Sequence, residues 1–109
     1  MRHKSNSHLD YIRELGCVVC GDAIRTEAAH IRYPDPRAAK PLTGMGIKPD
    51  DCYVVPLCNK HHHNQHRMSE RAFWVSHDID PVPVALALWK HSGDHEAGCI
   101  VVANARGWK

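Results

Sequence analysis

The chain has 109 residues, enough for one compact domain and too few for two comfortable ones. Hydrophobic residues make up 43% and charged residues 24%, a balance typical of a soluble globular protein. The formal net charge of only +2 excludes DNA binding by bulk charge, although a local basic groove is compatible with it. No apolar run approaches the roughly 18 residues of a membrane helix, and the start MRHKSNSH lacks the apolar segment of a secretory signal. We therefore expect a cytoplasmic protein without a membrane partner.

The first half of the chain predicts a helix followed by two strands. In order, the elements are a helix over 8–15, a strand over 25–33, a loop over 34–50, and a strand over 53–56 that runs into Leu57 and Cys58. Ser7 is a typical N-cap for the helix, and Gly16 a typical stop. Prolines and glycines concentrated between the strands predict the loop.

The second half predicts helices. They cover 60–68, a segment from Glu70 to Val75 capped by Ser69, and a segment after Pro83. The apolar stretch 96–106 fits a helix or a strand, and we favour a helix. Trp74 and Trp89 fall in apolar helical patterns and are expected in the core. The whole chain, 1–109, is expected to be one α+β domain, with its functional core at about 17–67 and a helical extension at about 69–106.

Cysteine and histidine are unusually frequent, with five cysteines and ten histidines. Disulfides are disfavoured in a reducing cytosol, so clustered Cys and His indicate a metal site. Two pairs have the spacing of zinc ligands, Cys17-x2-Cys20 and Cys58-x2-His61. Two such turns can close a tetrahedron around Zn²⁺, which would stabilise a domain with a thin core.

Two alternatives concern this zinc site. His62 or His63 could replace His61 as the fourth ligand, since all three are adjacent. The Cys17-x2-Cys20 pair could also be a redox pair, but no βαβ pattern surrounds it. The remaining cysteines, Cys52 and Cys99, are isolated in the sequence and are expected to be small buried hydrophobic residues.

A second metal is suggested by His62 and His66, which are four residues apart. On a helix they share one face and can bind one ion, leaving open positions for water or phosphate. An isolated pair of this spacing is more often a solvated surface feature. Here the adjoining Cys58-x2-His61 ligands would fix the start of the helix and make a rigid platform.

His30 is the candidate general base. It ends the predicted strand, and an imidazole with an ordinary pKa near 6.5 can accept a proton from water at neutral pH. Asp51, just before the second strand, could orient that imidazole or help to hold a metal. Taken alone, His30 would more often be a solvated histidine, and Asp51 would more often be a turn residue.

Together these motifs resemble the HNH nucleases of the ββα-metal (His-Me finger) superfamily. The resemblance spans about residues 17–67 and rests on CxxC, Ala29-His30-Ile31, Asp51, and Val55-Pro56-Leu57-Cys58-x2-His61-His62 with His66. The stretches AHIR, GMGIKPDD, VPLCNKHHHNQH and ERAFW look most like the phage recombination-enhancement (Ref-like) members. The resemblance implies a small ββα-metal core with a zinc knuckle and flanking helices.

The resemblance also implies a mechanism and its residues. His30 would activate water, Asp51 would take the place of an Asn that orients it, and His62 with His66 would hold a catalytic divalent cation, Mg²⁺ or Mn²⁺. The structural zinc set would be Cys17, Cys20, Cys58 and His61. The expected activity is hydrolysis of DNA phosphodiester bonds, leaving 5′-phosphate and 3′-hydroxyl ends, in phage recombination or DNA processing inside the bacterial host cell. The expected partners are DNA and a recombination protein or protein-coated DNA.

Two positions depart from the family pattern. Many HNH enzymes have Asp or His as a metal ligand just before the base, where this chain has Ala29, and Asp51 replaces Asn. The cation would then rest on His62 and His66 with water, and Asp51 is a further candidate ligand.

Basic residues near the proposed site are a candidate phosphate-contacting rim. Arg32, Lys48 and Arg67 are the first choices for nucleic-acid contact, with Arg25, Arg37 and Lys40 as further members. Two other functions stay open: an inactive zinc module that binds DNA or a recombination protein, which Ala29 favours, and a zinc-stabilised interaction domain without a nucleic-acid role.

Overall fold

The computed structural model describes residues 5–33 and 51–106 of the chain. Within them lie five helices and a two-stranded sheet, in the order α1 (Asn6–Arg13), β1 (Thr26–His30), β2 (Val54–Cys58), α2 (Asn59–Arg67), α3 (Glu70–Ser76), α4 (Pro81–Lys90) and α5 (His95–Arg106). The fold is a small α+β domain, as the sequence predicts. The predicted loop over 34–50 lies outside the described residues, and so does the candidate DNA contact Lys48.

Helix α1 begins two residues earlier than predicted. The expected N-cap, Ser7, is wrong: Ser5 has the extended backbone of a cap, and its hydroxyl accepts a hydrogen bond from the His8 amide. Both serines are good caps by type, so the choice depends on what lies outside the helix. The Ser5 amide donates to the Asp51 carboxylate at 2.7 Å, a contact between residues far apart in the sequence.

Strands β1 and β2 form an antiparallel pair at the centre of the molecule. Their register pairs Glu27 with Leu57 and His30 with Val54. Every residue of β2 is buried, whereas β1 buries only Ala29. Pro56 lacks an amide hydrogen, and its carbonyl accepts from the Val18 amide at 2.9 Å, which fastens the preceding loop to β2.

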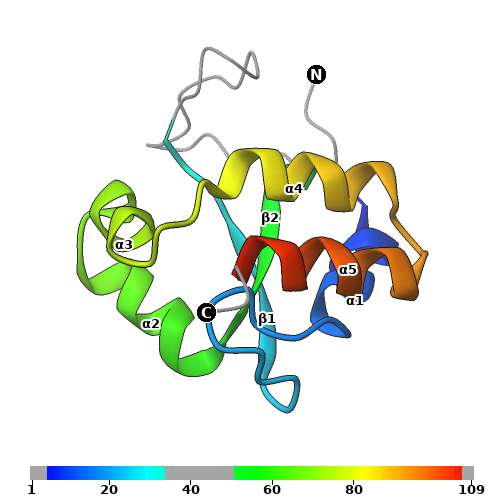
Figure 1. Ribbon diagram of the computed structural model, residues 1–109, viewed down its shortest axis with the longest axis horizontal. Coiled ribbons are helices and arrows are strands. Elements are labelled where there is room, and N and C mark those ends of the chain that lie inside the picture. The colour runs from blue at the N-terminus through cyan, green and yellow to red at the C-terminus, as the bar shows by residue number, and fades with distance from the viewer. Residues whose placement is uncertain (1–4, 34–50, 107–109) are drawn as a thin grey trace.

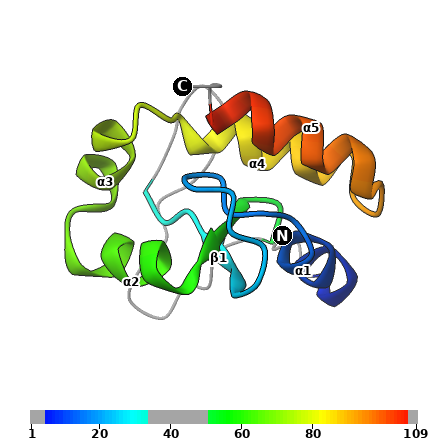
Figure 2. The same cartoon turned by 60° about the horizontal axis from the view of Figure 1, so that its bottom comes forward.

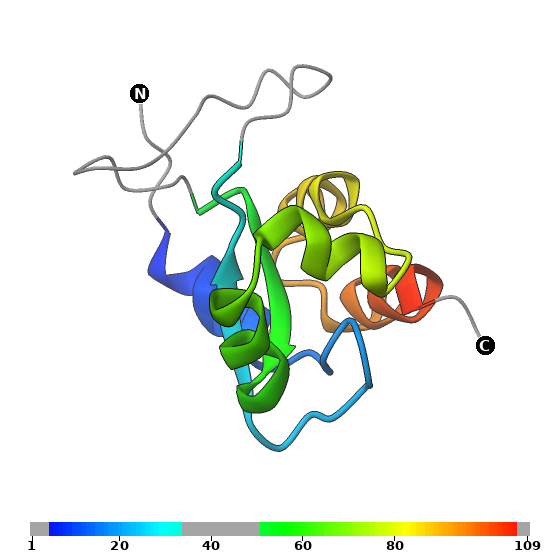
Figure 3. The ribbon, with the colours of Figure 1, turned by 90° about the vertical axis from the view of Figure 1, so that its left-hand side faces the viewer.

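The helices surround this hairpin. Figures 1 and 2 show α1 and α2 on opposite sides of the strands, with α4 and α5 packed together as a separate layer. Figure 3 views the molecule from the side of α2 and α3, and α2 lies along the hairpin there. No helix among residues 5–33 and 51–106 is long and apolar enough to cross a membrane.

The predicted helices of the second half are present with small shifts at their ends. Ser69 caps α3 as predicted, accepting from the Ala72 amide. Helix α4 starts at Pro81 and not after Pro83, because proline is well tolerated in a first turn, where an amide hydrogen has no helical partner. The apolar stretch 96–106, which fits a helix or a strand by sequence, lies in helix α5, so the favoured helix is confirmed.

The core combines residues from all the layers. Trp74 is buried and Trp89 packs against the core at its edge, as predicted. Cys52 is buried as expected, but the same expectation for Cys99 is wrong, because Cys99 lies on the exposed side of α5. The buried positions of that helix are Gly98 and Val102, so Cys99 falls just outside its packed face.

A buried histidine makes the stability of this core depend on pH. His8 is 1% exposed, its Nδ1 lies 2.8 Å from the Ser92 hydroxyl, and its ring packs edge-on to Trp89. Burial lowers the pKa of His8, although the Asp51 carboxylate acts in the opposite direction. The unfolded chain therefore binds a proton more readily, and the folded state loses stability as the pH falls through about 6.5.

We therefore expect the Tm of the wild type to fall more between about pH 7.5 and pH 5.5 than that of His8→Phe. Thermal unfolding followed by circular dichroism measures both curves. The exposed His91 gives a matched control, His91→Phe, whose pH dependence should follow the wild type. Parallel curves for wild type and His8→Phe would contradict the assignment to His8.

Candidate metal centre and adjoining histidine site

The first half of the metal centre is a tight turn after α1. The Gly21 amide donates to the Cys17 carbonyl at 2.8 Å, which closes the turn around Cys17 and Cys20. Gly21 has φ +82°, a conformation that side-chain-bearing residues rarely adopt. The Val19 amide lies 3.4 Å from the Cys17 sulfur and is a donor to it. The backbone thus presents both sulfurs to one point.

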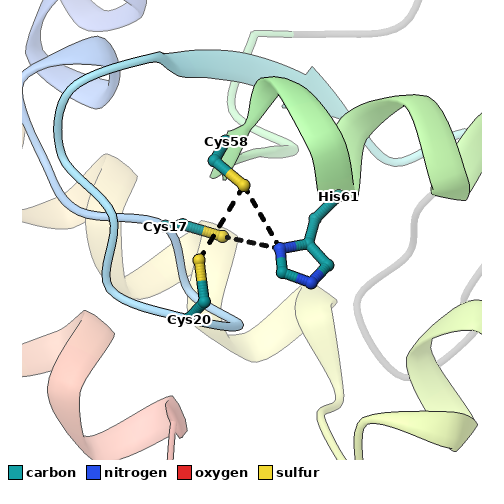
Figure 4. A group of neighbouring side chains, drawn as sticks. All are labelled: Cys17, Cys20, Cys58 and His61. Carbon is teal, nitrogen blue, oxygen red and sulfur yellow. Dashed lines mark hydrogen bonds between the residues drawn. The ribbon is translucent and has the colours of Figure 1, made fainter.

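The second half comes from the junction of β2 and α2. Cys58 ends the strand and is the residue before the helix, and His61 follows one turn later. Figure 4 shows the three sulfurs and the His61 ring facing one another. All four ligand atoms of Cys17, Cys20, Cys58 and His61 lie within 4.8 Å of one another. The structure thus brings His61, the first choice for the fourth ligand, into the cluster.

The spacing of these atoms fits a tetrahedral ion. Zn–S bonds of about 2.3 Å at tetrahedral angles separate two sulfurs by about 3.8 Å. Cys20 Sγ and Cys58 Sγ are 3.8 Å apart, and His61 Nδ1 lies 3.2 Å from Cys58 Sγ and 3.7 Å from Cys17 Sγ. The separation of the Cys20 and Cys58 sulfurs is also too long for a disulfide. The cluster could therefore hold a metal ion such as zinc.

The electrostatics of the cluster show what a cation would change. Partial burial of its sulfur raises the pKa of the Cys20 thiol to about 11; Cys17 and Cys58 add to the effect, and a backbone hydrogen bond from Asp22 opposes it. Burial, then the neighbouring His77 and Lys60, lowers the pKa of His61. Metal ligands must be thiolates and neutral imidazoles, so metal binding here would release thiol protons.

The other two predicted metal ligands form a separate pair on α2. His62 Nε2 and His66 Nε2 lie 3.2 Å apart. On its other side, His62 Nδ1 lies 2.7 Å from a carboxylate oxygen of Glu27 in β1. Burial, followed by the charge of His62, lowers the pKa of His66, and hydrogen bonds from His62 and Asn59 lower that of Glu27.

The candidate base, His30, is held by the Asp51 carboxylate. His30 Nε2 lies 2.9 Å from Asp51 Oδ1, and the Ser5 amide donates to Asp51 Oδ2 at 2.7 Å. Asp51 is 2% exposed, whereas His30 remains partly accessible. Because a carboxylate accepts hydrogen bonds, the Nε2–H of His30 is the donor, and Nδ1 of the neutral ring carries the lone pair.

His30 and His66 open onto the same small pocket. It has a volume of about 200 Å³ and is lined by His30, Arg32, Gln65, His66, Met68 and Glu70. The Glu70 carboxylate accepts the Arg32 amide at 3.1 Å and the Gln65 side-chain amide at 3.2 Å. These bonds join the segment after β1 to α2 and α3 around the pocket, which the candidate base and one candidate metal ligand share.

Three residues that contact the histidine pair or line the pocket are not predicted from the sequence: Glu27, Gln65 and Glu70. Glu27 belongs to the predicted strand and precedes Ala29 by two residues, so strand alternation places both on one face and could have flagged it. Gln65 and Glu70 carry no such signal, because their contact depends on how α2 packs against α3. Of the candidate DNA contacts, Arg32 and Arg67 are exposed beside α2 and the pocket. Arg25 is exposed as well, whereas Arg37 and Lys40 lie outside the described residues.

Comparison with known proteins adds a family but no activity. No curated protein and no solved structure matches the chain. One family model matches residues 1–85, which include the cysteine turn, His30, Asp51 and all of α2. The chain belongs to the family described as "Protein of unknown function (DUF968)".

Proposed function

We propose that this protein is a metal-dependent HNH-type endonuclease that hydrolyses DNA phosphodiester bonds. The observation that carries the proposal is a pocket that His30 and His66 both line, so that two groups of side chains adjoin there. One is a histidine base backed by a carboxylate, His30 with Asp51, and the other is the His62 and His66 pair. The chain order of β1, β2 and α2, with the base on the first strand and the pair on the helix, agrees with the resemblance to that superfamily.

His30 supplies the general base. Its Nε2–H is held by Asp51, so the ring cannot turn freely and the Nδ1 lone pair is the site that takes a proton from water. The Asp51 carboxylate also stabilises the positive imidazolium that forms after the transfer. Asp51 is thus a positioning residue, and its other oxygen is held by the start of α1.

His62 and His66 fit a divalent cation. Two nitrogens, each about 2.0–2.1 Å from one ion, lie about 2.8–3.4 Å apart at angles between octahedral and tetrahedral. Their Nε2 atoms are 3.2 Å apart. A divalent cation there, Mg²⁺ or Mn²⁺, would stabilise the charge that develops on the phosphate and on the leaving 3′-oxygen. Two imidazoles leave the remaining positions to water and substrate.

The cysteine cluster has a structural role in this proposal. Zinc held by Cys17, Cys20, Cys58 and His61 has all four positions filled by protein and is closed to substrate. It would join the turn after α1 to the start of α2, the helix that carries the pair. Exposed Arg32 and Arg67 are the proposed phosphate contacts. Phage recombination or DNA processing in the host cytoplasm, with a recombination protein as partner, is the proposed setting.

A second candidate is a DNA-binding module without cleavage. It is favoured by Ala29, which is fully buried and contributes no ligand where many HNH enzymes have one. This candidate predicts salt-sensitive DNA binding with no divalent-dependent cutting.

The test is cleavage of supercoiled plasmid and of single-stranded DNA, with Mg²⁺ or Mn²⁺ added to the zinc-loaded protein. The wild type is expected to cut, and His62→Ala/His66→Ala is expected to lose at least about 100-fold in rate, because it cannot hold the cation. His63→Ala is the matched control, since His63 is exposed on the same helix. A folded wild type that cuts neither DNA with either metal would refute the proposal, and DNA binding by that protein would favour the second candidate.

A further inference from the structure

We propose that Glu27 is the positioning residue of the divalent-cation site. It accepts the Nδ1–H of His62 and thereby keeps the Nε2 lone pair of that ring directed at His66. The inference rests on the proposed function for the identity of the site as a cation site. Nothing in the resemblance assigns Glu27 a role.

The contact itself is short and supported on both sides. Glu27 Oε1 lies 2.7 Å from His62 Nδ1, and the Asn59 side chain donates to Glu27 Oε2 at 3.3 Å. The backbone of Glu27 is fixed by its ladder position opposite Leu57. Asn59 and His62, one turn apart on α2, therefore both bind the Glu27 carboxylate, which comes from β1.

The contact selects one form of the His62 ring. A neutral imidazole carries a single N–H, and a carboxylate accepts only, so that hydrogen sits on Nδ1 of His62. Nε2 is then the acceptor nitrogen, and it is the atom that lies 3.2 Å from His66 Nε2. A metal-binding histidine commonly donates its other N–H to a carboxylate, which fixes the ring and raises its basicity.

Glu27 also accounts for the missing ligand at position 29. Ala29 is buried and carries no donor atom, so position 29 adds no ligand and no charge to the His62 and His66 pair. Glu27 lies two residues earlier on the same face of β1 and brings one negative charge against the back of His62. The charge that an Asp just before the base would place on the metal itself would here act through a histidine.

The first measurement concerns the ring and needs neither cation nor DNA. Nitrogen-15 NMR of the zinc-loaded protein at about pH 8.5, well above the ordinary imidazole pKa near 6.5, reports which nitrogen of His62 carries hydrogen. We expect the Nδ1–H form in the wild type and its loss in Glu27→Ala. Glu27→Gln keeps an oxygen acceptor without the charge, and should retain much of the Nδ1–H form. An unchanged His62 tautomer in Glu27→Ala would overturn the inference.

The second measurement is Mn²⁺ affinity, by titration calorimetry of the same zinc-loaded proteins. Loss of a carboxylate behind a ligating histidine typically costs about 10–100-fold in metal affinity, so Glu27→Ala should bind Mn²⁺ that much more weakly, with Glu27→Gln between. Glu96→Gln, which removes a negative charge from an exposed position of α5, should bind as the wild type does. Zinc content and circular dichroism check that each variant folds, which we expect because the Glu27 side chain is 46% exposed.

These outcomes separate the inference from the proposed nuclease. Equal Mn²⁺ affinity of wild type and Glu27→Ala would overturn the inference even if the wild type cuts DNA. A wild type that binds no Mn²⁺ would overturn it as well. A wild type that binds Mn²⁺ in a Glu27-dependent way and cuts no DNA would support the inference and refute the nuclease.

Discussion

His30→Ala is expected to lower the rate of divalent-dependent DNA cleavage by about 10²–10⁴-fold, the usual contribution of a general base. The imidazole is held by the buried Asp51 carboxylate on one side and opens onto the pocket on the other, and the second histidine of that pocket, His66, is assigned to the cation. Zinc content and Tm should stay close to the wild type, because His30 ends a strand and is partly exposed. The measurement is the rate of plasmid nicking at saturating Mg²⁺ or Mn²⁺.

A second variant shows whether the base depends on its support. Asp51→Asn keeps one oxygen that can accept the His30 Nε2–H, but its NH2 group cannot accept from the Ser5 amide, and it removes the charge that stabilises the imidazolium. It should cut more slowly than the wild type and faster than His30→Ala. His91→Ala, at an exposed position, is the control and should cut normally. Wild-type cleavage by a folded, zinc-containing His30→Ala would contradict the role of His30 as base.

The order and type of the described elements could be predicted because local signals and packing agree. Two helix starts could not, and the strand predicted over 25–33 is shorter, because β1 ends at His30. Ser5 and Ser7 are equivalent caps by type, and the bond from Ser5 to Asp51 is invisible to local sequence. Pro81 and Pro83 are both compatible with a first helical turn. Residue type alone does not predict the exposure of Cys99, because the packed face of α5 decides it.

In the candidate site, too, some contacts follow from local sequence and others depend on tertiary packing. The spacing of Cys17 with Cys20 and of Cys58 with His61 is local, and it predicts the cluster that the fold brings together. The proximity of His62 and His66 follows from helical geometry alone. Strand alternation places Glu27 on the same face as Ala29, but its contact with His62 depends on the register of β1 against β2 and on the position of α2, which no local pattern contains.

Loss of the metal from the cysteine cluster is expected to unfold the domain or to leave it only marginally stable. The cluster joins the turn at Cys17 and Cys20 to the point where β2 passes into α2. Structural zinc contributes about 10–16 kcal/mol of apparent binding free energy in small zinc domains, against a net stability of about 5–15 kcal/mol for a folded domain. Removing one ligand in Cys58→Ser, or the metal with a strong chelator, should therefore lower the Tm by more than about 10 °C.

The measurement is zinc content, by elemental analysis, beside thermal unfolding with and without chelator. The wild type should carry one zinc per chain after dialysis against metal-free buffer, because the cluster is closed and three of its ligands are thiolates. Cys99→Ser is the matched control, since Cys99 is exposed on α5 and lies outside the cluster, and it should melt and bind zinc as the wild type does. An equal Tm with and without chelator, in a protein shown to have lost its metal, would mean that packing of the hairpin and helices alone sustains the fold. The cluster would then need a role other than stability, and the reasoning that ties α2 and its histidine pair to the zinc would fail with it.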